Sequence, residues 1–98
     1  MSLLVRYTLK SAEAHAHQVE AMTDLVNALT SEGVPVHYSC FSTEEATQFI
    51  GVLEFDDEAG KQAFLASAAF AAYRDTVGPT FANPPQTTMI DAIASTRT

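Results

Sequence analysis

Four side chains expected to face the interior of the fold carry groups that can take part in acid–base chemistry: Tyr7, His15, Tyr38 and Tyr73. A neutral imidazole accepts a proton near pH 7, so His15 is the candidate general base. A tyrosine buries its ring while its hydroxyl donates or accepts a hydrogen bond. Grouped in a dry cleft, these residues would position a ligand and move a proton. Each also fits an ordinary structural role, with the imidazole hydrogen-bonded locally and the tyrosine rings in the core.

The other reactive side chains form no recognisable motif. His15 and His17 lie two residues apart, where helical side chains point in different directions, so the pair lacks the spacing of a metal site. Cys40 has no cationic neighbour in sequence that would favour its thiolate, and we expect a small core residue there. No Gly-rich phosphate loop, Ser-His-Asp pattern or pair of carboxylates stands out. We therefore expect neither a metal nor a cofactor.

Size and charge restrict the class of protein. The 98 residues suit a single domain, 1–98, and carry 12 acidic against five basic side chains, for a formal net charge of −7. This charge repels nucleic acids and anionic membrane surfaces, so neither is an expected partner. Arg6, Lys10 and Glu54 interrupt the apolar runs, and none approaches the roughly 20 residues of a membrane-spanning helix. The single cysteine and an N-terminus unlike a secretory signal predict a cytoplasmic protein.

A strand and a helix are predicted at the start of the chain. Residues 2–10 alternate apolar and polar side chains with the period of a strand. Ser11 is expected to cap the helix that follows, and Gly33 and Pro35 end it. Steps of four and three define one apolar stripe on this helix, which consists of His15, Val19, Met22, Val26 and Leu29.

A hairpin follows. Residues 36–42 and 48–55 have the composition of strands, and the short polar link 43–46 makes them antiparallel neighbours. Asp56 and Asp57 then offer caps for a second helix.

The second helix carries mostly small apolar residues, and Ser67 marks a break within it. Gly78 and Pro79 stop it, residues 81–86 form an extended crossing, and residues 87–94 are the last strand. The expected buried stripe of this helix consists of Ala59, Ala63, Ala66, Phe70, Tyr73 and Val77.

This order of elements, βαββαβ, is that of an α+β domain with a ferredoxin-like fold. Right-handed crossovers favour a four-stranded antiparallel sheet with the strands in the order 4-1-3-2. Strand parity places the more apolar face under the helices: Leu3, Val5, Tyr7, Leu9, Val36, Tyr38, Cys40, Phe49, Gly51, Leu53 and Phe55.

The opposite face of the sheet is also too apolar to remain in water. It would carry Leu4, Phe41, Ile50 and Val52 as one patch, and a second copy of the chain is the simplest cover. We therefore predict a homodimer. On the same face, Arg6 and Glu54 are expected to pair across neighbouring strands, either as a structural ion pair or dimer contact or with Arg6 in a catalytic role.

Three segments resemble antibiotic biosynthesis monooxygenase domains, and the similarity extends over nearly the whole chain. They are Glu32-Gly33 with the nearby His37-Tyr38-Ser39-Cys40-Phe41, the strand and cap 51–59, and the helix 63–73. The resemblance implies a dimeric α/β barrel with a ligand cleft between sheet and helices in each subunit. Members of the family include oxygenases that act on electron-rich aromatic compounds without metal or flavin, quinol oxygenases and haem-degrading enzymes.

The sequence departs from the family at positions that often carry chemistry. Phe64 and Ala69 stand where the second helix often has His, and Phe55 stands where many members have Trp. At the Trp and His positions of the haem degraders this chain has Phe55 and Tyr73, and it contains no Trp, so haem cleavage of that type is disfavoured.

The resemblance leads to a functional hypothesis, a cofactor-independent monooxygenase that oxidises a small aromatic, polyketide or quinol-type substrate with O₂. The expected catalytic residues are His15, Tyr73 and Tyr38, and the expected substrate-binding residues are Tyr7, Gly51, Phe55 and Phe70. The missing His and Trp leave an alternative open, a non-catalytic small-molecule-binding or interaction dimer on the same scaffold.

Overall fold

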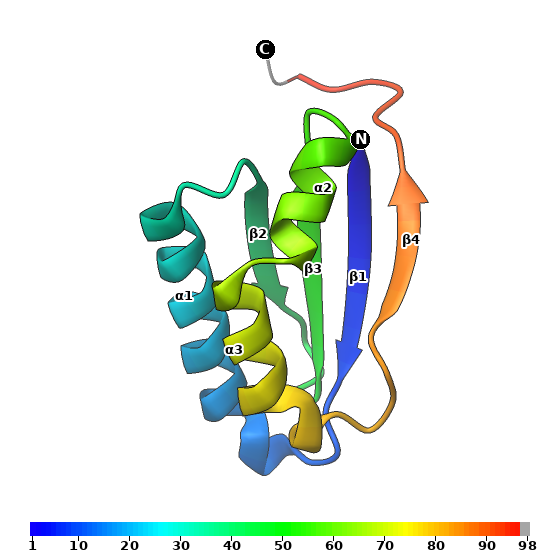
Figure 1. Cartoon of the computed structure of the whole chain (residues 1–98). Coiled ribbons are helices and arrows are strands. Elements are labelled where there is room, and N and C mark those ends of the chain that lie inside the picture. Colours follow the sequence, from blue (N-terminus) through cyan, green and yellow to red (C-terminus); the bar gives the residue numbers. More distant parts are fainter. Residues whose placement is uncertain (97–98) are drawn as a thin grey trace.

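One four-stranded antiparallel sheet is covered on one face by helices (Figure 1). The computed structural model describes residues 1–96. The strand order is β2-β3-β1-β4, which confirms the predicted ferredoxin-like topology. In chain order, the elements are β1 (Ser2–Thr8), η1 (Ala12–Ala14), α1 (His15–Glu32), β2 (His37–Ser42), β3 (Gln48–Glu54), α2 (Glu58–Leu65), α3 (Ala68–Val77), η2 (Gly78–Thr80) and β4 (Gln86–Ile90).

The ends of the helices follow local hydrogen bonding. Asp57 caps α2, because its side chain accepts a hydrogen bond from the backbone N–H of Gly60. The predicted break at Ser67 is confirmed, since its hydroxyl oxygen accepts from the backbone N–H of Phe70 and starts α3. Ser11 was expected to act in the same way, but its side chain makes no capping hydrogen bond. The last strand ends at Ile90, four residues before the predicted end at residue 94.

Alternating burial along the strands confirms the predicted faces of the sheet. Val5 and Tyr7 on β1 are buried, as are Gly51 and Leu53 on β3, and the residues between them are more exposed. The predicted pairing of Arg6 with Glu54 is wrong, because the register places Arg6 opposite Ile50 and Glu54 opposite Ser2. Four residues of strand separate the two positions by about 13 Å.

The predicted stripes of the helices are correct only in part: Met22 and Leu29 of the first and Tyr73 and Val77 of the second are buried as predicted. On α1, Val19 is 44% exposed, while Gln18 is fully buried. The buried residues of the helix are Gln18, Ala21, Met22, Leu25 and Leu29. On α2, Ala59, Ala63 and Ala66 are exposed, and Gly60 and Phe64 face the core instead. A phenylalanine removes far more apolar surface from water than an alanine, so its position decides the orientation of this short helix.

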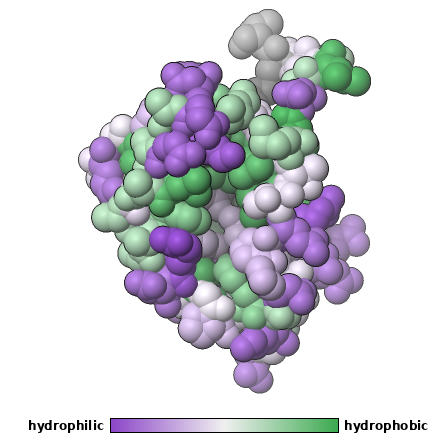
Figure 2. Space-filling model, turned by 45° about the vertical axis from the view of Figure 1, so that its right-hand side comes forward, coloured by the Kyte–Doolittle hydropathy of each residue, from purple (hydrophilic) through white to green (hydrophobic). Residues whose placement is uncertain are grey.

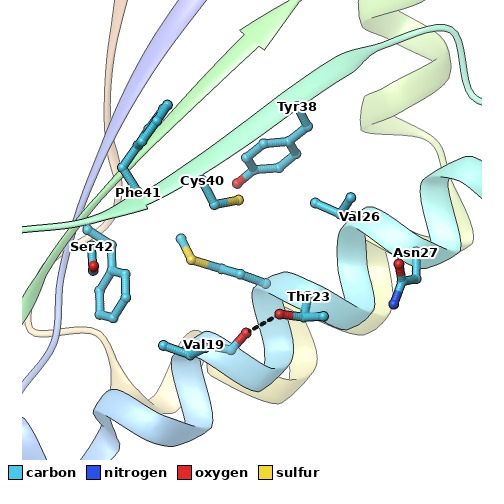
Figure 3. Close-up of a pocket in the computed structure, with 10 residues that line it drawn as sticks. Val19, Thr23, Val26, Asn27, Tyr38, Cys40, Phe41 and Ser42 are labelled. Atoms are coloured by element: carbon cyan, nitrogen blue, oxygen red, sulfur yellow. Dashed lines mark hydrogen bonds between the residues drawn. The ribbon is translucent and has the colours of Figure 1, made fainter.

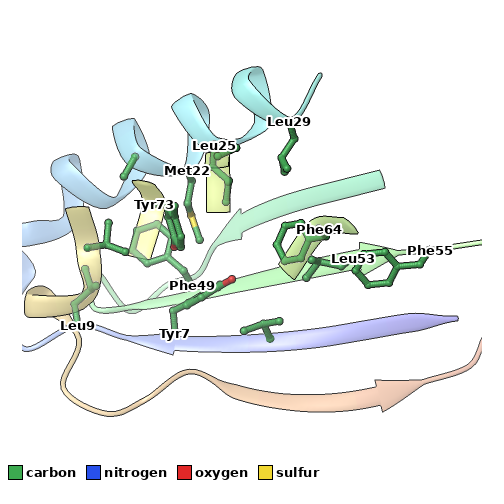
Figure 4. Packing of buried hydrophobic residues seen from close by; sticks show 14 residues of the cluster. Tyr7, Leu9, Met22, Leu25, Leu29, Phe49, Leu53, Phe55, Phe64 and Tyr73 are labelled. Atoms are coloured by element: carbon green, nitrogen blue, oxygen red, sulfur yellow. The ribbon is translucent and has the colours of Figure 1, made fainter. Parts of the chain in front are cut away.

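The core lies between the sheet and the three helices (Figure 4). Its largest contributions come from aromatic rings of both layers, with Phe64 of α2 against Phe55 and Phe70 at centroid distances of 5.9 and 4.6 Å. Among residues 1–96, no helix has both the length and the apolar character needed to cross a membrane.

Candidate functional site

A cleft of about 590 Å³ lies between the sheet and helices α2 and α3. The segment between α3 and β4 forms its outer wall, and Figure 2 shows a hollow bordered by hydrophobic surface on this side of the molecule. The wall is mainly apolar, with Leu3, Val5, Leu53, Phe64, Phe70 and Phe81. Its polar side chains are few and consist of Tyr7, Tyr73, Arg74, Asn83 and Thr87. A large apolar cavity with a few polar groups is the usual form of a small-molecule site.

Three tyrosines, from here on the tyrosine cluster, connect this cleft with the core: Tyr7, Tyr38 and Tyr73. The hydroxyls of Tyr7 and Tyr38 lie 2.6 Å apart, which is the distance of a strong hydrogen bond. The rings of Tyr7 and Tyr73 meet edge to face, with centroids 6.4 Å apart. Tyr7 and Tyr73 line the cleft, whereas Tyr38 lies behind them.

Burial keeps all three hydroxyls protonated at neutral pH. Desolvation raises the pKa of Tyr7 to about 12, and the hydrogen bond with Tyr38 offsets only part of this effect. Burial likewise raises the pKa values of Tyr38 and Tyr73 far above the ordinary value of a tyrosine. The cluster therefore offers hydrogen-bond donors to a ligand and no ready proton acceptor.

Gly51 allows the cluster to form. It lies on β3 between Tyr7 of β1 and Tyr38 of β2, opposite Val5 and Cys40 in the register. A Cβ atom here would lie 3.0 Å from Cε1 and 3.1 Å from the hydroxyl of Tyr38, and 3.3 Å from Cε2 of Tyr7. Gly51 was predicted from the sequence as a substrate-binding residue. The two tyrosine rings fill the space beside it, and Gly51 does not line the cleft.

Gly51→Ala is expected to lower the free energy of unfolding by about 1–3 kcal/mol, because the added methyl group pushes the Tyr38 ring away from Tyr7. Chemical denaturation measures this loss. Gly78→Ala is the matched control, since a Cβ at Gly78 meets no atom within 4 Å. Equal stability of the two variants would show that the close packing at Gly51 is unimportant.

Gln18 is a member of the site that sequence reasoning missed. Its side chain is fully buried, and its Nε2 donates a hydrogen bond of 2.8 Å to the hydroxyl oxygen of Tyr73. The hydroxyl proton of Tyr73 must therefore point elsewhere, toward Tyr7 or the cleft. The spacing of Gln18 to Met22, Leu25 and Leu29 is helical, and a polar residue on that buried line was the available signal.

The amide oxygen of Gln18 has no hydrogen-bond partner among the described residues. An unpaired buried acceptor lowers the free energy of unfolding by about 1–3 kcal/mol. Gln18 therefore orients the Tyr73 hydroxyl and at the same time reduces the stability of the fold.

His15 lies apart from the cleft. Its Nδ1 donates to the backbone carbonyl of Ala46 at 2.8 Å, and its ring packs on Phe49 with centroids 4.9 Å apart. These contacts tie the start of α1 to the β2–β3 connection, and they do not bring His15 to Tyr38 or Tyr73. Of the predicted substrate-binding residues, Tyr7 and Phe70 line the cleft, while Phe55 is buried behind Phe64.

A second cavity of about 440 Å³ opens between α1 and β2 (Figure 3). Tyr38 and Cys40 line it, so the tyrosine cluster separates two cavities. Burial raises the pKa of the Cys40 thiol to about 11, and a hydrogen bond with Tyr38 offsets part of the shift. At neutral pH this thiol is protonated and therefore a poor nucleophile. In residues 1–96, no group of three or more His, Cys, Asp or Glu side chains is arranged to hold a metal ion.

Solved structures of other proteins share this fold. No family model and no curated protein sequence matches the chain. Among solved structures, one antibiotic biosynthesis monooxygenase superposes with a TM-score of 0.82 at 17% identity, covering 95% of this chain and 98% of that one. Rv0793 from Mycobacterium tuberculosis superposes with a TM-score of 0.80 at 12% identity, over 97% and 96% of the two chains.

A third structure carries a described activity. It is a variant of SnoaB from Streptomyces nogalater, a cofactor-independent oxygenase, with a TM-score of 0.77 at 10% identity over 99% of this chain and 96% of that chain. At 10–17% identity, these similarities establish the fold, which is that of the antibiotic biosynthesis monooxygenases. The resemblance stated from the sequence is confirmed at this level.

Proposed function

We propose that this protein is a cofactor-independent monooxygenase that oxidises a small aromatic, polyketide or quinol-type substrate with O₂. One observation carries the proposal, namely the apolar cleft of about 590 Å³ whose lining includes two tyrosines, Tyr7 and Tyr73, with hydroxyls that stay protonated at neutral pH. The fold, shared with a described cofactor-independent oxygenase, supports it.

The proposed reaction balances without an external reductant. When a phenol becomes a quinone, one atom of O₂ forms the new carbonyl group on the ring, and the other leaves as water with the two hydrogens lost from the broken C–H and O–H bonds. The substrate supplies all the electrons that reduce O₂. Electron transfer from the substrate to O₂ is easiest from its phenolate or enolate, so the protein must favour that anion.

The residues of the cleft suit this task. The apolar wall holds a flat ring and excludes water, which strengthens every polar interaction inside. Tyr73, its oxygen already engaged by Gln18, donates its proton to the substrate oxygen and stabilises negative charge there. Because the hydroxyls of the cluster are already protonated at neutral pH, they cannot accept the proton of the substrate, which loses it to solvent as it enters the cleft.

Tyr73→Phe is expected to lower kcat/KM for O₂ uptake by about tenfold, the value of one hydrogen bond to a charged group. The measurement uses an oxygen electrode with metal-free, flavin-free protein and a panel of phenols, quinols and anthrones. His15→Gln is the comparison variant, because His15 is the base predicted from the sequence and lies outside the cleft. We expect it to retain most of the activity.

Two results would contradict the proposal. The absence of O₂ uptake across the whole panel would favour the alternative, a non-catalytic binding dimer. The lack of the His and Trp residues that many family members carry also supports that alternative. If His15→Gln loses its activity while Tyr73→Phe keeps all of it, the reaction takes place near His15 and not in the cleft.

We further propose that the protein is a homodimer joined through the face of the sheet that carries no helix. Phe41 is 51% exposed on this face, and Leu4, Ile50 and Val52 on the neighbouring strands are only half-buried. Contiguous apolar surface of this kind on a small protein marks an interaction site.

A further inference from the structure

Arg74 is the one cationic side chain among the described residues that line the cleft. Among the described residues that line the cleft there is no Asp or Glu and no other Arg or Lys. The guanidinium carbon of Arg74 lies 4.8 Å from the centre of the Phe70 ring, one turn earlier on α3. This cation–π contact fixes the side chain beside the apolar wall while its N–H groups stay accessible.

Arg74 has no acidic partner in the part of the chain that the structure describes. In a chain with 12 acidic side chains, it makes no ion pair and no side-chain hydrogen bond within residues 1–96. A guanidinium presents five donors in a fixed fork that matches a carboxylate. The donors of Arg74 are therefore available to a ligand in the cleft.

The position of Arg74 in the last turn of α3 also has a plain structural explanation, because a cation there complements the negative end of the helix. That explanation does not say why the side chain of Arg74 lines the cleft. The end of α3, at Gly78, lines the same cleft, and the helix dipole together with the net charge of −7 disfavours anions there. An anionic ligand could bind in this cleft only with a local cation, and Arg74 is the one present in its described lining.

We propose that the cleft takes an aromatic acid, a ligand with a flat apolar body and one anionic group, and that Arg74 binds the anionic group. The inference rests on the proposed function and narrows its substrate class. The ring of the ligand would pack against Phe64 and Phe70. An oxygen on the ring would accept a hydrogen bond from the Tyr73 hydroxyl, and the acidic group would form an ion pair with the guanidinium of Arg74.

A matched pair of dyes tests the role of the charge without any turnover. Anilinonaphthalene sulfonate and N-phenylnaphthylamine share one ring system, and only the first carries an anionic group. Fluorescence titration of the whole chain is expected to show tighter binding of the sulfonate. Arg74→Gln should weaken sulfonate binding by about tenfold, as expected for a charge-assisted hydrogen bond, and change binding of the neutral dye by less than about twofold.

Two control variants separate the guanidinium from charge in general. Lys61→Gln changes the net charge by the same amount, and Lys61 lies on α2 outside the cleft lining, so both dyes should bind as in the wild type. Arg74→Lys keeps the charge but loses the fork, and it should restore part of the affinity for the sulfonate. If Arg74→Gln weakens both dyes alike, Arg74 is a structural residue and the inference fails.

The same titrations separate this inference from the proposed function. Equal affinity of the wild-type protein for both dyes would overturn the acidic ligand and leave an apolar cleft fit for a neutral substrate. If neither dye binds, the cleft does not accept an aromatic ligand, and both the inference and the proposed monooxygenase fail.

Discussion

Phe64→Ala is expected to lower the free energy of unfolding by about 3–5 kcal/mol, the range for removal of a buried phenylalanine ring. Phe64 is 4% exposed. Its ring contacts those of Tyr38, Phe55 and Phe70 at centroid distances of 6.1, 5.9 and 4.6 Å, so it joins α2 to the sheet and to α3. Urea denaturation followed by circular dichroism measures the loss.

Leu65→Ala provides the control for Phe64→Ala. Leu65 is the next residue on the same short helix and is 43% exposed, so its truncation should cost less than about 1 kcal/mol. The comparison is a direct test of the orientation of α2. Similar losses in the two variants would mean that α2 turns another side to the core, and the wall of the cleft formed by Phe64 would then be wrong.

The arrangement of the sheet was predictable because its signal repeats along β1, β2 and β3. Alternation on residues 2–10 and 48–55 placed Tyr7 and Leu53 on the helix side, and their burial confirms it. Since Tyr38 shares this face, parity alone placed two members of the tyrosine cluster under the helices. Their hydroxyl contact depends on the missing side chain of Gly51, a relation across three strands that no local pattern carries.

The helices were harder to orient because alanine fits either a buried or an exposed position. In α2, Ala59 and Ala63 suggested one stripe, whereas the single large ring of Phe64 decided another. In α1, counting only apolar residues selected Val19 and overlooked Gln18, whose burial depends on a partner on α3. His15 does lie on the side of α1 that faces the sheet, where it packs on Phe49, but at the start of the helix and outside the cleft. Its hydrogen-bond partner, the Ala46 carbonyl, lies in a connection without a sequence signal.

The cleft itself could not be derived from the sequence. Its outer wall is the segment between α3 and β4, where Pro84 and Pro85 exclude regular structure without fixing a path. Two long-range contacts determine that path, a bridge between Leu9 and Phe81 and a backbone hydrogen bond from Ala82 to Thr8. Tertiary contacts of this kind decide whether an apolar pocket closes or stays open.

Val52→Lys is expected to raise the dissociation constant of the proposed homodimer by about 100-fold or more, because each uncompensated buried charge costs several kcal/mol. In a two-fold symmetric interface the change counts twice, once for each protomer. Val52 lies at the centre of the open face, paired with Leu4 on β1 and Ser39 on β2. Analytical ultracentrifugation across a range of protein concentrations measures the constant.

The control for Val52→Lys is Ala16→Lys, which adds the same charge at an exposed position on α1, the layer on the other side of the sheet. It should leave the dimer intact. The wild-type protein provides the stricter test. If the half-buried Leu4, Ile50 and Val52 and the exposed Phe41 form a dimer interface, the wild-type protein should be a dimer at micromolar concentration. Folded wild-type monomers under those conditions would refute the interface, while the cleft, which lies within one chain, would be unaffected.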